Sequence, residues 1–352
     1  MIGTIPTGTM QALAKTQPAE GLEQITAPIP QMGPEDVLIK VRRTAVCGTD
    51  IHIWNWDEWS QKNVPVPMIT GHEFAGDIVA IGAEVDRPLK IGQRVSAEGH
   101  VIDLNSEAAR AGHFHLDPHT RGIGVNRQGC FAEYVVAPAF NVIELPDDVP
   151  YEIGSILDPF GNAVHTAQQF DLLGEDVLVT GAGPIGVMAA AVARHAGART
   201  VVLTDINDFR LELAQKVVPG VRTVNTTRED LHDVMKELGL KVGFDVALEM
   251  SGSPIAFKQC VDTLIMGGGL ALLGIPARPV ETDWGQIILK AINIKGVYGR
   301  EMFTTWRKML GLLKAGLDLT PLITHQMHYS EFREGFEAMK SGQSGKVVLN
   351  WD

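Results

Sequence analysis

Cysteine is scarce in this sequence. The 352 residues include only Cys47, Cys130 and Cys260. An odd number of widely spaced cysteines does not indicate a disulfide framework, so we expect a protein of the reducing cytoplasm.

Long apolar runs and clusters of positive charge are also missing. No apolar run approaches the roughly 18–20 residues that a membrane-spanning helix needs. Residues 1–9 have neither the basic start nor the apolar core of a secretory signal. The formal net charge is −12, and no Lys/Arg cluster interrupts it, so neither a nucleic acid nor a membrane is an expected partner.

Chain length and pattern predict two domains of an α/β protein. Residues 10–160 contain short strand patterns separated by Gly, Pro and Asn clusters, which predicts an antiparallel, barrel-like, β-rich domain. From about residue 170 to 300, strand and helix patterns alternate, which predicts a doubly wound parallel sheet of the Rossmann type. The expected division is a tail over 1–9, a β-rich domain over 10–160 and 300–352, and a Rossmann domain over 161–299. In the second domain the expected strands are 176–180, 200–205, 221–225, 244–250, 269–274 and 293–298, and the expected helices are 185–196, 209–217, 229–238 and 254–266.

A glycine motif lies between the first strand and the first helix of the expected Rossmann domain. In Gly181-x-Gly183-x-x-Gly186 the glycines suit a tight turn, close approach of a pyrophosphate, and close helix–strand packing, in that order. Asp205 follows 19 residues after Gly186, at the end of the next expected strand. A carboxylate there binds both ribose hydroxyls of NAD and repels a 2′-phosphate. The pattern therefore predicts an NAD site, against the alternative of a glycine turn and a solvated aspartate.

Three residues of the first domain suit a metal. Cys47, His72 and Glu73 offer a thiolate, an imidazole and a carboxylate. A catalytic zinc takes three such protein ligands and keeps one position open. Each residue alone has an ordinary reading, as a buried apolar cysteine or a surface ion pair. Together, upstream of an NAD domain, they predict a catalytic zinc site.

The segments Cys47-Gly48-Thr49-Asp50 and Gly71-His72-Glu73-Phe74-Ala75-Gly76, followed by Val79, resemble the zinc-dependent medium-chain alcohol dehydrogenase superfamily. Residues 47–62, 122–127, 158–166 and 299–303 resemble more closely the branch that acts on L-threonine. The similarity runs from residue 10 to residue 352. The resemblance implies a GroES-like catalytic domain, a Rossmann NAD domain and a homotetramer. It also implies oxidation of L-threonine, or of a similar β-hydroxy amino acid, to a ketone, which for threonine is 2-amino-3-oxobutanoate.

Carried over residue by residue, the resemblance makes Cys47, His72 and Glu73 the zinc ligands. It places Asp158 beside the metal, as a further ligand or a relay partner, and it gives Thr49 and His52 the task of carrying the hydroxyl proton away. The ordinary alternatives for this pair are a turn hydroxyl and a structural histidine. On the coenzyme side, Ile185, Asp205 and Arg210 would hold the adenosine and phosphates, and the nicotinamide pocket would be lined by Leu273, Gly274, Ile275, Val297 and Tyr298.

The sequence differs from the pattern of the resembling family at residues 100–120, a segment that we call the lobe. Relatives usually carry a structural zinc there on four cysteines, and the corresponding positions in this sequence are Asp103, Ser106, Ala109 and Asp117. A four-thiolate site is impossible, so we expect one zinc per chain and a lobe held by packing and hydrogen bonds. The lobe histidines (His100, His113, His115 and His119) are a less favoured replacement site.

Substrate recognition is weakly specified by the sequence. Glu73 or Asp158 could face the substrate ammonium, and His100 or Arg300 could face its carboxylate. The alternatives are a zinc-dependent polyol or secondary-alcohol dehydrogenase and, from another class, a non-catalytic NAD-binding protein. A zinc-free quinone reductase of the same fold has no need for Cys47, His72 and Glu73 together.

Overall fold

The computed structural model describes residues 2, 3 and 5–352, which fold into two compact units. The first contains the described residues up to Asp158 together with 323–341 and 346–352, and the second contains 159–322 and 342–345. Residues 300–322 therefore belong to the second unit, although we expected them in the first. The chain crosses between the units more than once near its end, and no sequence pattern marks those crossings.

The first unit is built on an eight-stranded sheet of order β11-β7-β6-β4-β19-β18, with β1 paired to β6 and β10 to β4. All pairs are antiparallel except β18–β19. This arrangement and a smaller β3-β2-β5 sheet confirm the expected β-rich, antiparallel domain. The strands are β1 (Ile2–Gly3), β2 (Thr9–Lys15), β3 (Glu23–Pro28), β4 (Asp36–Ala45), β5 (Met68–Ile69), β6 (Glu73–Ile81), β7 (Arg94–Ala97), β8 (His100–Val101), β9 (Arg121–Gly122), β10 (Tyr134–Pro138), β11 (Val142–Glu144), β18 (Ile323–His328) and β19 (Lys346–Asn350).

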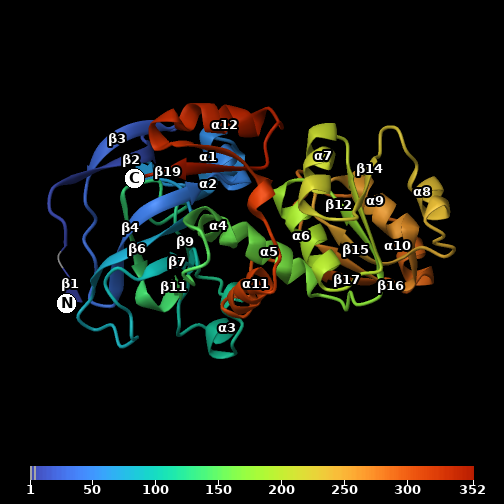
Figure 1. Ribbon diagram of the computed structural model, residues 1–352, viewed down its shortest axis with the longest axis horizontal. Helices are drawn as coiled ribbons and strands as arrows, with labels where there is room; N and C mark the ends of the chain where they lie inside the picture. The colour runs from blue at the N-terminus through green and yellow to red at the C-terminus, as the bar shows by residue number, and fades with distance from the viewer. Residues whose placement is uncertain (1, 4) are drawn as a thin grey trace. The chain divides into compact units, whose positions relative to one another are not determined.

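Helices of the first unit are short and were mostly not expected from the sequence. They are α1 (Gly48–Asn55), α2 (Glu58–Asn63), α3 (Glu107–Arg110), α4 (Tyr151–Ser155) and α12 (Phe332–Lys340), with single turns η1 (Phe114–Leu116), η2 (Ala139–Asn141) and η4 (Tyr329–Glu331). Helix α12 packs on β18 and β19 (Figure 1). Its Phe336 stacks on Trp54 of α1, with ring centroids 4.7 Å apart. The C-terminal helix therefore anchors α1 to the core.

The N-terminal segment differs from the expected tail. Residues Ile2–Gly3 form β1, which pairs with Ala80 and Ile81 of β6, and β2 already begins at Thr9. Residues 1 and 4 lie outside the described residues.

The second unit has a six-stranded sheet of order β14-β13-β12-β15-β16-β17, in which every pair is parallel. This is the strand order of a dinucleotide-binding Rossmann domain, and it confirms the expected fold. Helices α6 and α7 lie on one face of the sheet, and α8, α9 and α10 on the other (Figure 1). The strands are β12 (Asp176–Thr180), β13 (Thr200–Asp205), β14 (Arg222–Asn225), β15 (Phe244–Glu249), β16 (Leu264–Leu272) and β17 (Asn293–Gly296). The helices are α5 (Leu157–Ala167), which begins in the first unit, α6 (Pro184–His195), α7 (Asp208–Val217), α8 (Leu231–Glu237), α9 (Pro254–Thr263), α10 (Trp284–Leu289) and α11 (Thr304–Lys314), with a turn η3 (Thr320–Leu322).

The expected helix boundaries are within two residues of those observed for α6, α7 and α8, and the largest error is at the end of α9. We expected a helix over 254–266, but α9 ends at Thr263 and Leu264 is already extended. The apolar run Leu264–Met266 suits either a helix or a buried strand, and the three glycines that follow make continuation of the helix unfavourable. The segment therefore opens β16.

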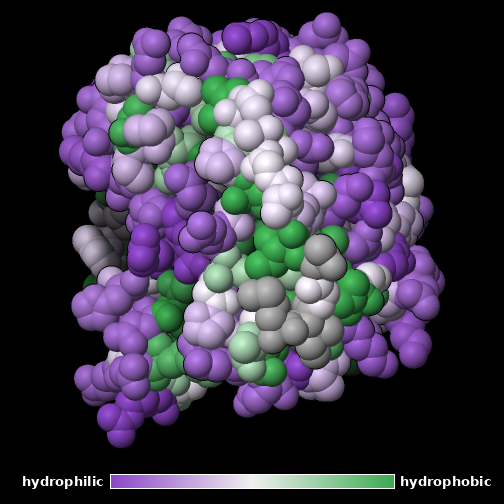
Figure 2. Space-filling model, turned by 90° about the vertical axis from the view of Figure 1, so that its left-hand side faces the viewer, coloured by the Kyte–Doolittle hydropathy of each residue, from purple (hydrophilic) through white to green (hydrophobic). Residues whose placement is uncertain are grey.

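None of the described helices is long and apolar enough to cross a bilayer. Hydrophilic residues cover most of the face of the first unit shown in Figure 2, and hydrophobic residues gather in its lower half.

The lobe is closed by one carboxylate, that of Asp117, at one of the four positions where the resemblance led us to look for a cysteine. Asp117 is buried, and its Oδ2 accepts the backbone N–H of Asp103 at 2.8 Å while its Oδ1 accepts that of His119 at 3.2 Å. Burial alone would raise the pKa of Asp117, but these bonds and the Ser106 hydroxyl hold it below its ordinary value. Hydrogen bonds thus link both ends of the lobe, as expected.

Replacing Asp117 by Ala should destabilise the first unit by about 1–3 kcal/mol, because two backbone N–H groups lose their bonds to a charged acceptor. Asp117→Asn, which keeps one acceptor oxygen, should lose less. Thermal unfolding of both variants measures this, with His113→Ala on the exposed lobe surface as a control. Equal unfolding temperatures for Asp117→Ala and the control would contradict this account of the lobe.

Candidate active site

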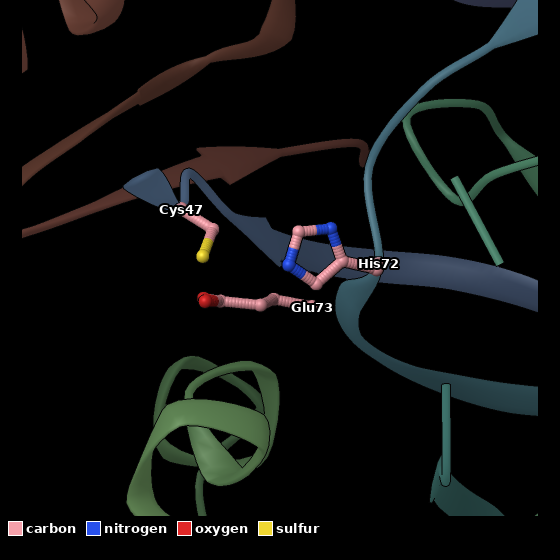
Figure 3. Close-up of side chains that lie close together, drawn as sticks. All are labelled: Cys47, His72 and Glu73. Carbon is pink, nitrogen blue, oxygen red and sulfur yellow. The ribbon is translucent and has the colours of Figure 1, made fainter. Parts of the chain in front are cut away.

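Cys47, His72 and Glu73 point toward one another in the first unit (Figure 3). One ligand atom from each, the thiol sulfur, a ring nitrogen and a carboxylate oxygen, lies within 4.8 Å of the other two. Among the described residues this is the only group of three or more His, Cys, Asp or Glu side chains close enough to hold a metal. The three expected ligands are therefore brought together.

Local backbone geometry produces this convergence. Strand β4 ends at Ala45, and Cys47 then caps α1, where its backbone N–H donates to Asp50 Oδ2 at 2.9 Å. Gly71 precedes the histidine with a φ of 86°. A Cβ at Gly71 would lie 2.3 Å from the ring of Phe131, so only glycine allows the turn that aims His72 inward.

The cluster contains buried polar atoms with no partner. His72 Nδ1, Glu73 Oε1 and Asp50 Oδ1 are buried without a hydrogen bond, although His72 Nδ1 and Asp50 Oδ1 lie 3.8 Å apart. Burial opposes the charged imidazole, yet the negative groups Asp50 and Cys47 raise the pKa of His72 well above its ordinary value. Burial also raises the pKa of Glu73. A divalent cation would satisfy both the open lone pairs and the excess negative charge, so the donor set fits zinc.

Asp158 lies at the start of α5 and is 9% exposed. Its negative charge contributes to the raised pKa values of Asp50, His72 and Glu73, so it lies near the cluster. It is not one of the three side chains whose ligand atoms converge. Its role as ligand or relay partner stays a prediction.

Thr49 and His52 both lie on α1, three residues apart and therefore on one side of the helix. Thr49 Oγ1 is 3.9 Å from the sulfur of Cys47. His52 is solvent-accessible, and its Nδ1 lies 2.5 Å from Asp57 Oδ2. Helix α1 therefore leads from Cys47 to the solvent-accessible His52, and the proton path along it stays a prediction.

The glycine motif of the second unit has the geometry of a phosphate-binding turn. Gly181 has a φ of 92°, and a Cβ on Gly186 would lie 1.8 Å from the carbonyl oxygen of Gly181. Gly183 caps α6 and has no atom within 4 Å of the position that a Cβ would take. Pro184 then begins the helix without losing a hydrogen bond. Open space at a helix N-terminus suits a pyrophosphate.

Asp205 ends β13 beside this turn. Its Oδ2 accepts the N–H of Ala182 at 2.7 Å, and its Oδ1 accepts those of Ile206 and Asn207 at 2.8 and 2.9 Å. Arg210, on α7, lies 4.0 Å from the same carboxylate, and its Nε is buried without a partner. Ile185 is the second residue of α6. The residues expected to hold adenosine and phosphates thus lie around the ends of β12 and β13.

The residues expected to line the nicotinamide pocket follow the next strands. Leu273, Gly274 and Ile275 come directly after β16, and Val297 and Tyr298 after β17. The N–H of Val297 donates to Leu272 O at 2.8 Å, which joins the two loops. Both loops lie at the carboxyl ends of parallel strands, where ligands of such sheets bind.

The proposed contacts with the substrate carboxylate are in different surroundings. His100 is half-buried, and its Nδ1 lies 3.5 Å from Glu98, which is fully buried. Arg300 is 2% exposed and belongs to the second unit, where its side chain packs against Gly161. Contact of either residue with the substrate carboxylate stays a prediction.

Known proteins match the chain along almost its whole length. Residues 33–147 match the alcohol dehydrogenase GroES-like domain, and residues 184–315 match the zinc-binding dehydrogenase family. Over 97% of its length the chain is 67% identical to an L-threonine 3-dehydrogenase of Ruegeria pomeroyi, and 59% identical to one of Shewanella woodyi, and it covers 100% of each.

The chain belongs to the zinc-binding dehydrogenase family.

Solved structures of this family have the same fold. A zinc-binding dehydrogenase of Sinorhizobium meliloti bound to NADP matches with a TM-score of 0.89 at 26% identity, over 97% of this chain and 99% of that one. The 2R,3R-butanediol dehydrogenase of Bacillus subtilis matches with a TM-score of 0.88 at 25% identity, over 97% and 100%.

Lys346 is a site residue that sequence reasoning missed in this dehydrogenase. It begins β19, is 3% exposed, and donates to Glu73 Oε2 at 2.5 Å and to Val46 O at 2.8 Å. Although burial lowers the pKa of a lysine, the negative charges of Glu73 and Cys47 raise that of Lys346 above its ordinary value. The ammonium thus holds one oxygen of Glu73 and leaves the other free for a metal.

Glu249 is a second missed residue, at the coenzyme turn. It is 2% exposed, and its Oε1 accepts the N–H groups of Ser251 and Gly252 at 2.9 and 3.0 Å. The loop that contains Ser251 and Gly252 lies against Gly181, where a Cβ would be 2.8 Å from Ser251 Cβ. No motif marked this carboxylate, because its partners are backbone N–H groups and the common hydroxyls of Ser251 and Thr180.

Lys346→Met should destabilise the first unit by about 3–5 kcal/mol, because it leaves the buried Glu73 carboxylate without its cation. Lys62→Met, which breaks an exposed pair with Glu58 on α2, is the matched control and should change stability by less than about 0.5 kcal/mol. Denaturant unfolding with and without zinc measures both. Comparable stability of the two variants would show that Lys346 does not balance Glu73.

Proposed function

We propose that this chain oxidises the hydroxyl carbon of L-threonine to 2-amino-3-oxobutanoate, with transfer of a hydride to NAD. The observation that carries the proposal is the convergence of Cys47, His72 and Glu73 in a chain 67% identical to an L-threonine 3-dehydrogenase over 97% of its length. In the reaction the C–H bond gives its electron pair and hydrogen to the nicotinamide, and the O–H proton leaves to solvent.

Cys47, His72 and Glu73 would hold the zinc, and Lys346 would fix the carboxylate of Glu73. When bound, the zinc supplies Lewis-acid stabilisation of the negative charge that develops on the substrate oxygen. Thr49 and His52 would pass the hydroxyl proton outward along α1, since His52 is 61% exposed and can exchange that proton with water. Asp158 would add a negative charge beside the substrate.

NAD is the proposed coenzyme rather than NADP. The Sinorhizobium meliloti relative binds NADP, but Asp205 presents a carboxylate at the end of β13, where a 2′-phosphate would meet a like charge. Around it, Gly181, Gly183, Ile185, Gly186 and Arg210 would receive the adenosine and pyrophosphate. The nicotinamide would be received by Leu273, Gly274, Ile275, Val297 and Tyr298.

The substrate ammonium would meet Glu73 or Asp158, and the substrate carboxylate His100 or Arg300. A zinc-dependent secondary-alcohol dehydrogenase is the second candidate, since the fold also matches 2R,3R-butanediol dehydrogenase at 25% identity. The higher identity to L-threonine 3-dehydrogenases favours the amino acid.

The purified chain should reduce NAD with L-threonine and should show little rate with 2,3-butanediol, with sorbitol or with NADP. Removing zinc by a chelator should abolish the rate, and adding zinc should restore it, because the substrate oxygen loses its Lewis acid. NADH absorbance measures every case, and metal analysis should give one zinc per chain. Saturation by butanediol with indifference to threonine would favour the second candidate, and no turnover with any alcohol would indicate a non-catalytic NAD-binding protein.

We further propose a homotetramer in the cytoplasm, in which a second copy covers the edge strand β17. This strand ends the parallel sheet, and around it large apolar side chains are exposed: Trp284 at 68%, Ile288 at 71%, Leu289 at 78% and Ile294 at 37%. An uncovered edge with such a patch is unfavourable in water.

Ile288→Lys with Leu289→Lys should lower the mass in solution, because charges would be buried at that contact. Val242→Lys, at a residue 80% exposed on the loop after α8, is the control and should leave the mass unchanged. Analytical ultracentrifugation measures the mass. An unchanged mass for the double variant would exclude this face as the contact.

A further inference from the structure

One carboxylate next to α1 has two separate tasks. Asp57 follows α1 and caps α2, and its Oδ1 accepts the N–H of Ser60 at 2.9 Å and the hydroxyl of Ser60 at 3.0 Å. Its other oxygen, Oδ2, lies 2.5 Å from Nδ1 of His52. The cap of α2 therefore fixes the carboxylate that contacts His52.

The backbone between these residues is itself held in place. Trp56 closes α1 in a left-handed conformation with a φ of 52°. Lys15, which is 1% exposed, donates to the carbonyl of Trp54 at 3.3 Å and lies 5.3 Å from the ring centroid of Trp56. The position of Asp57 relative to His52 is therefore set by the core of the first unit.

The chemistry of a carboxylate determines the state of the imidazole. An ionised carboxylate can only accept, so Nδ1 of His52 must carry the hydrogen, and in the neutral ring Nε2 is then the free acceptor. The ring of Trp59 is the other described aromatic group near His52, with centroids 6.2 Å apart, and it carries no competing charge.

We propose that Asp57 is a positioning residue for proton release: it holds His52 in the Nδ1–H tautomer so that Nε2 takes the substrate proton. This inference rests on the proposed function, in which the proton passes from the substrate hydroxyl through Thr49 to His52. As Nε2 takes the proton, the imidazolium keeps its Nδ1–H bond to Asp57. Nε2 then returns the proton to water, and His52 is neutral again.

Asp57→Asn separates the two tasks of the carboxylate. Asn caps a helix as well as Asp, but its side chain has one acceptor oxygen, which can serve Ser60 or His52 and not both. The variant should therefore keep α2 and release His52. Ser60→Ala, which removes one donor to Asp57 but leaves both carboxylate oxygens, is the matched control.

The spectroscopic readout does not depend on turnover. Solid-state ¹⁵N NMR of protein labelled on the histidine rings reports the tautomer, and the His52 signals are assigned by their loss in His52→Gln. At pH 8, His52 of the unsubstituted chain should be the Nδ1–H tautomer alone. Asp57→Asn should give a mixture of both tautomers, and Ser60→Ala should match the unsubstituted chain. An unchanged tautomer in Asp57→Asn would overturn the proposal, whatever the substrate of the enzyme is.

The kinetic readout tests whether Asp57 acts through His52. With L-threonine and NAD, Asp57→Asn should lower kcat about tenfold, a part of the 10²–10⁴ that a general acid or base contributes, with KM for both substrates unchanged. Ser60→Ala should stay within about twofold. In a His52→Gln background Asp57→Asn should have no further effect. The proposal would be overturned if the effects of the two substitutions on kcat were fully additive, or if the His52→Gln chain were as active as the unsubstituted one. Failure of the unsubstituted chain to oxidise threonine would refute the proposed function alone.

Discussion

The buried charge balance around Glu73 is the constraint on which the first unit depends. Glu73 and Asp50 are fully buried carboxylates, and the charges that oppose them come from Lys346 and from the ring of His72. These four groups lie on different parts of the chain: Glu73 on β6, Asp50 on α1, Lys346 on β19 and His72 in the turn before β6. Because unpaired charges are very unfavourable inside a protein, the cluster is stable only when those parts meet. A bound cation adds to the same balance, so metal binding and folding of this unit are coupled.

Much of this architecture could be predicted because it depends on local patterns. The glycines at 181, 183 and 186 mark a strand-to-helix turn, and alternation of strands and helices then predicts the parallel sheet. Cys47, His72 and Glu73 could be found because their chemistry is unusual in short segments. Both predictions depend on residues that are close together in the sequence, so a single sequence is enough to make them.

Contacts between distant segments could not be predicted in the same way. Lys346 lies 273 residues from Glu73, in a final strand that looks like any other, and nothing in the sequence states that β19 pairs with β4. Glu249 was missed because its partners are backbone N–H groups and the hydroxyls of Ser251 and Thr180, none of which is distinctive in a sequence. The end of α9 was missed because Leu264–Met266 suits a helix and a strand equally, and the pairing of Leu264 with Phe244 of β15 decides between them.

The hydrogen-bonded lobe also limits where oxidants can damage this enzyme. A lobe closed by zinc thiolates can be opened by peroxide, since oxidised sulfur releases the metal. Here the Asp117 carboxylate makes the closing bonds, and a carboxylate has no such chemistry. Burial raises the pKa of Cys130 well above its ordinary value and that of Cys260 to about 12, so both thiols are inert. Among the three cysteines, thiol oxidation is thereby confined to Cys47, whose sulfur a bound zinc would occupy.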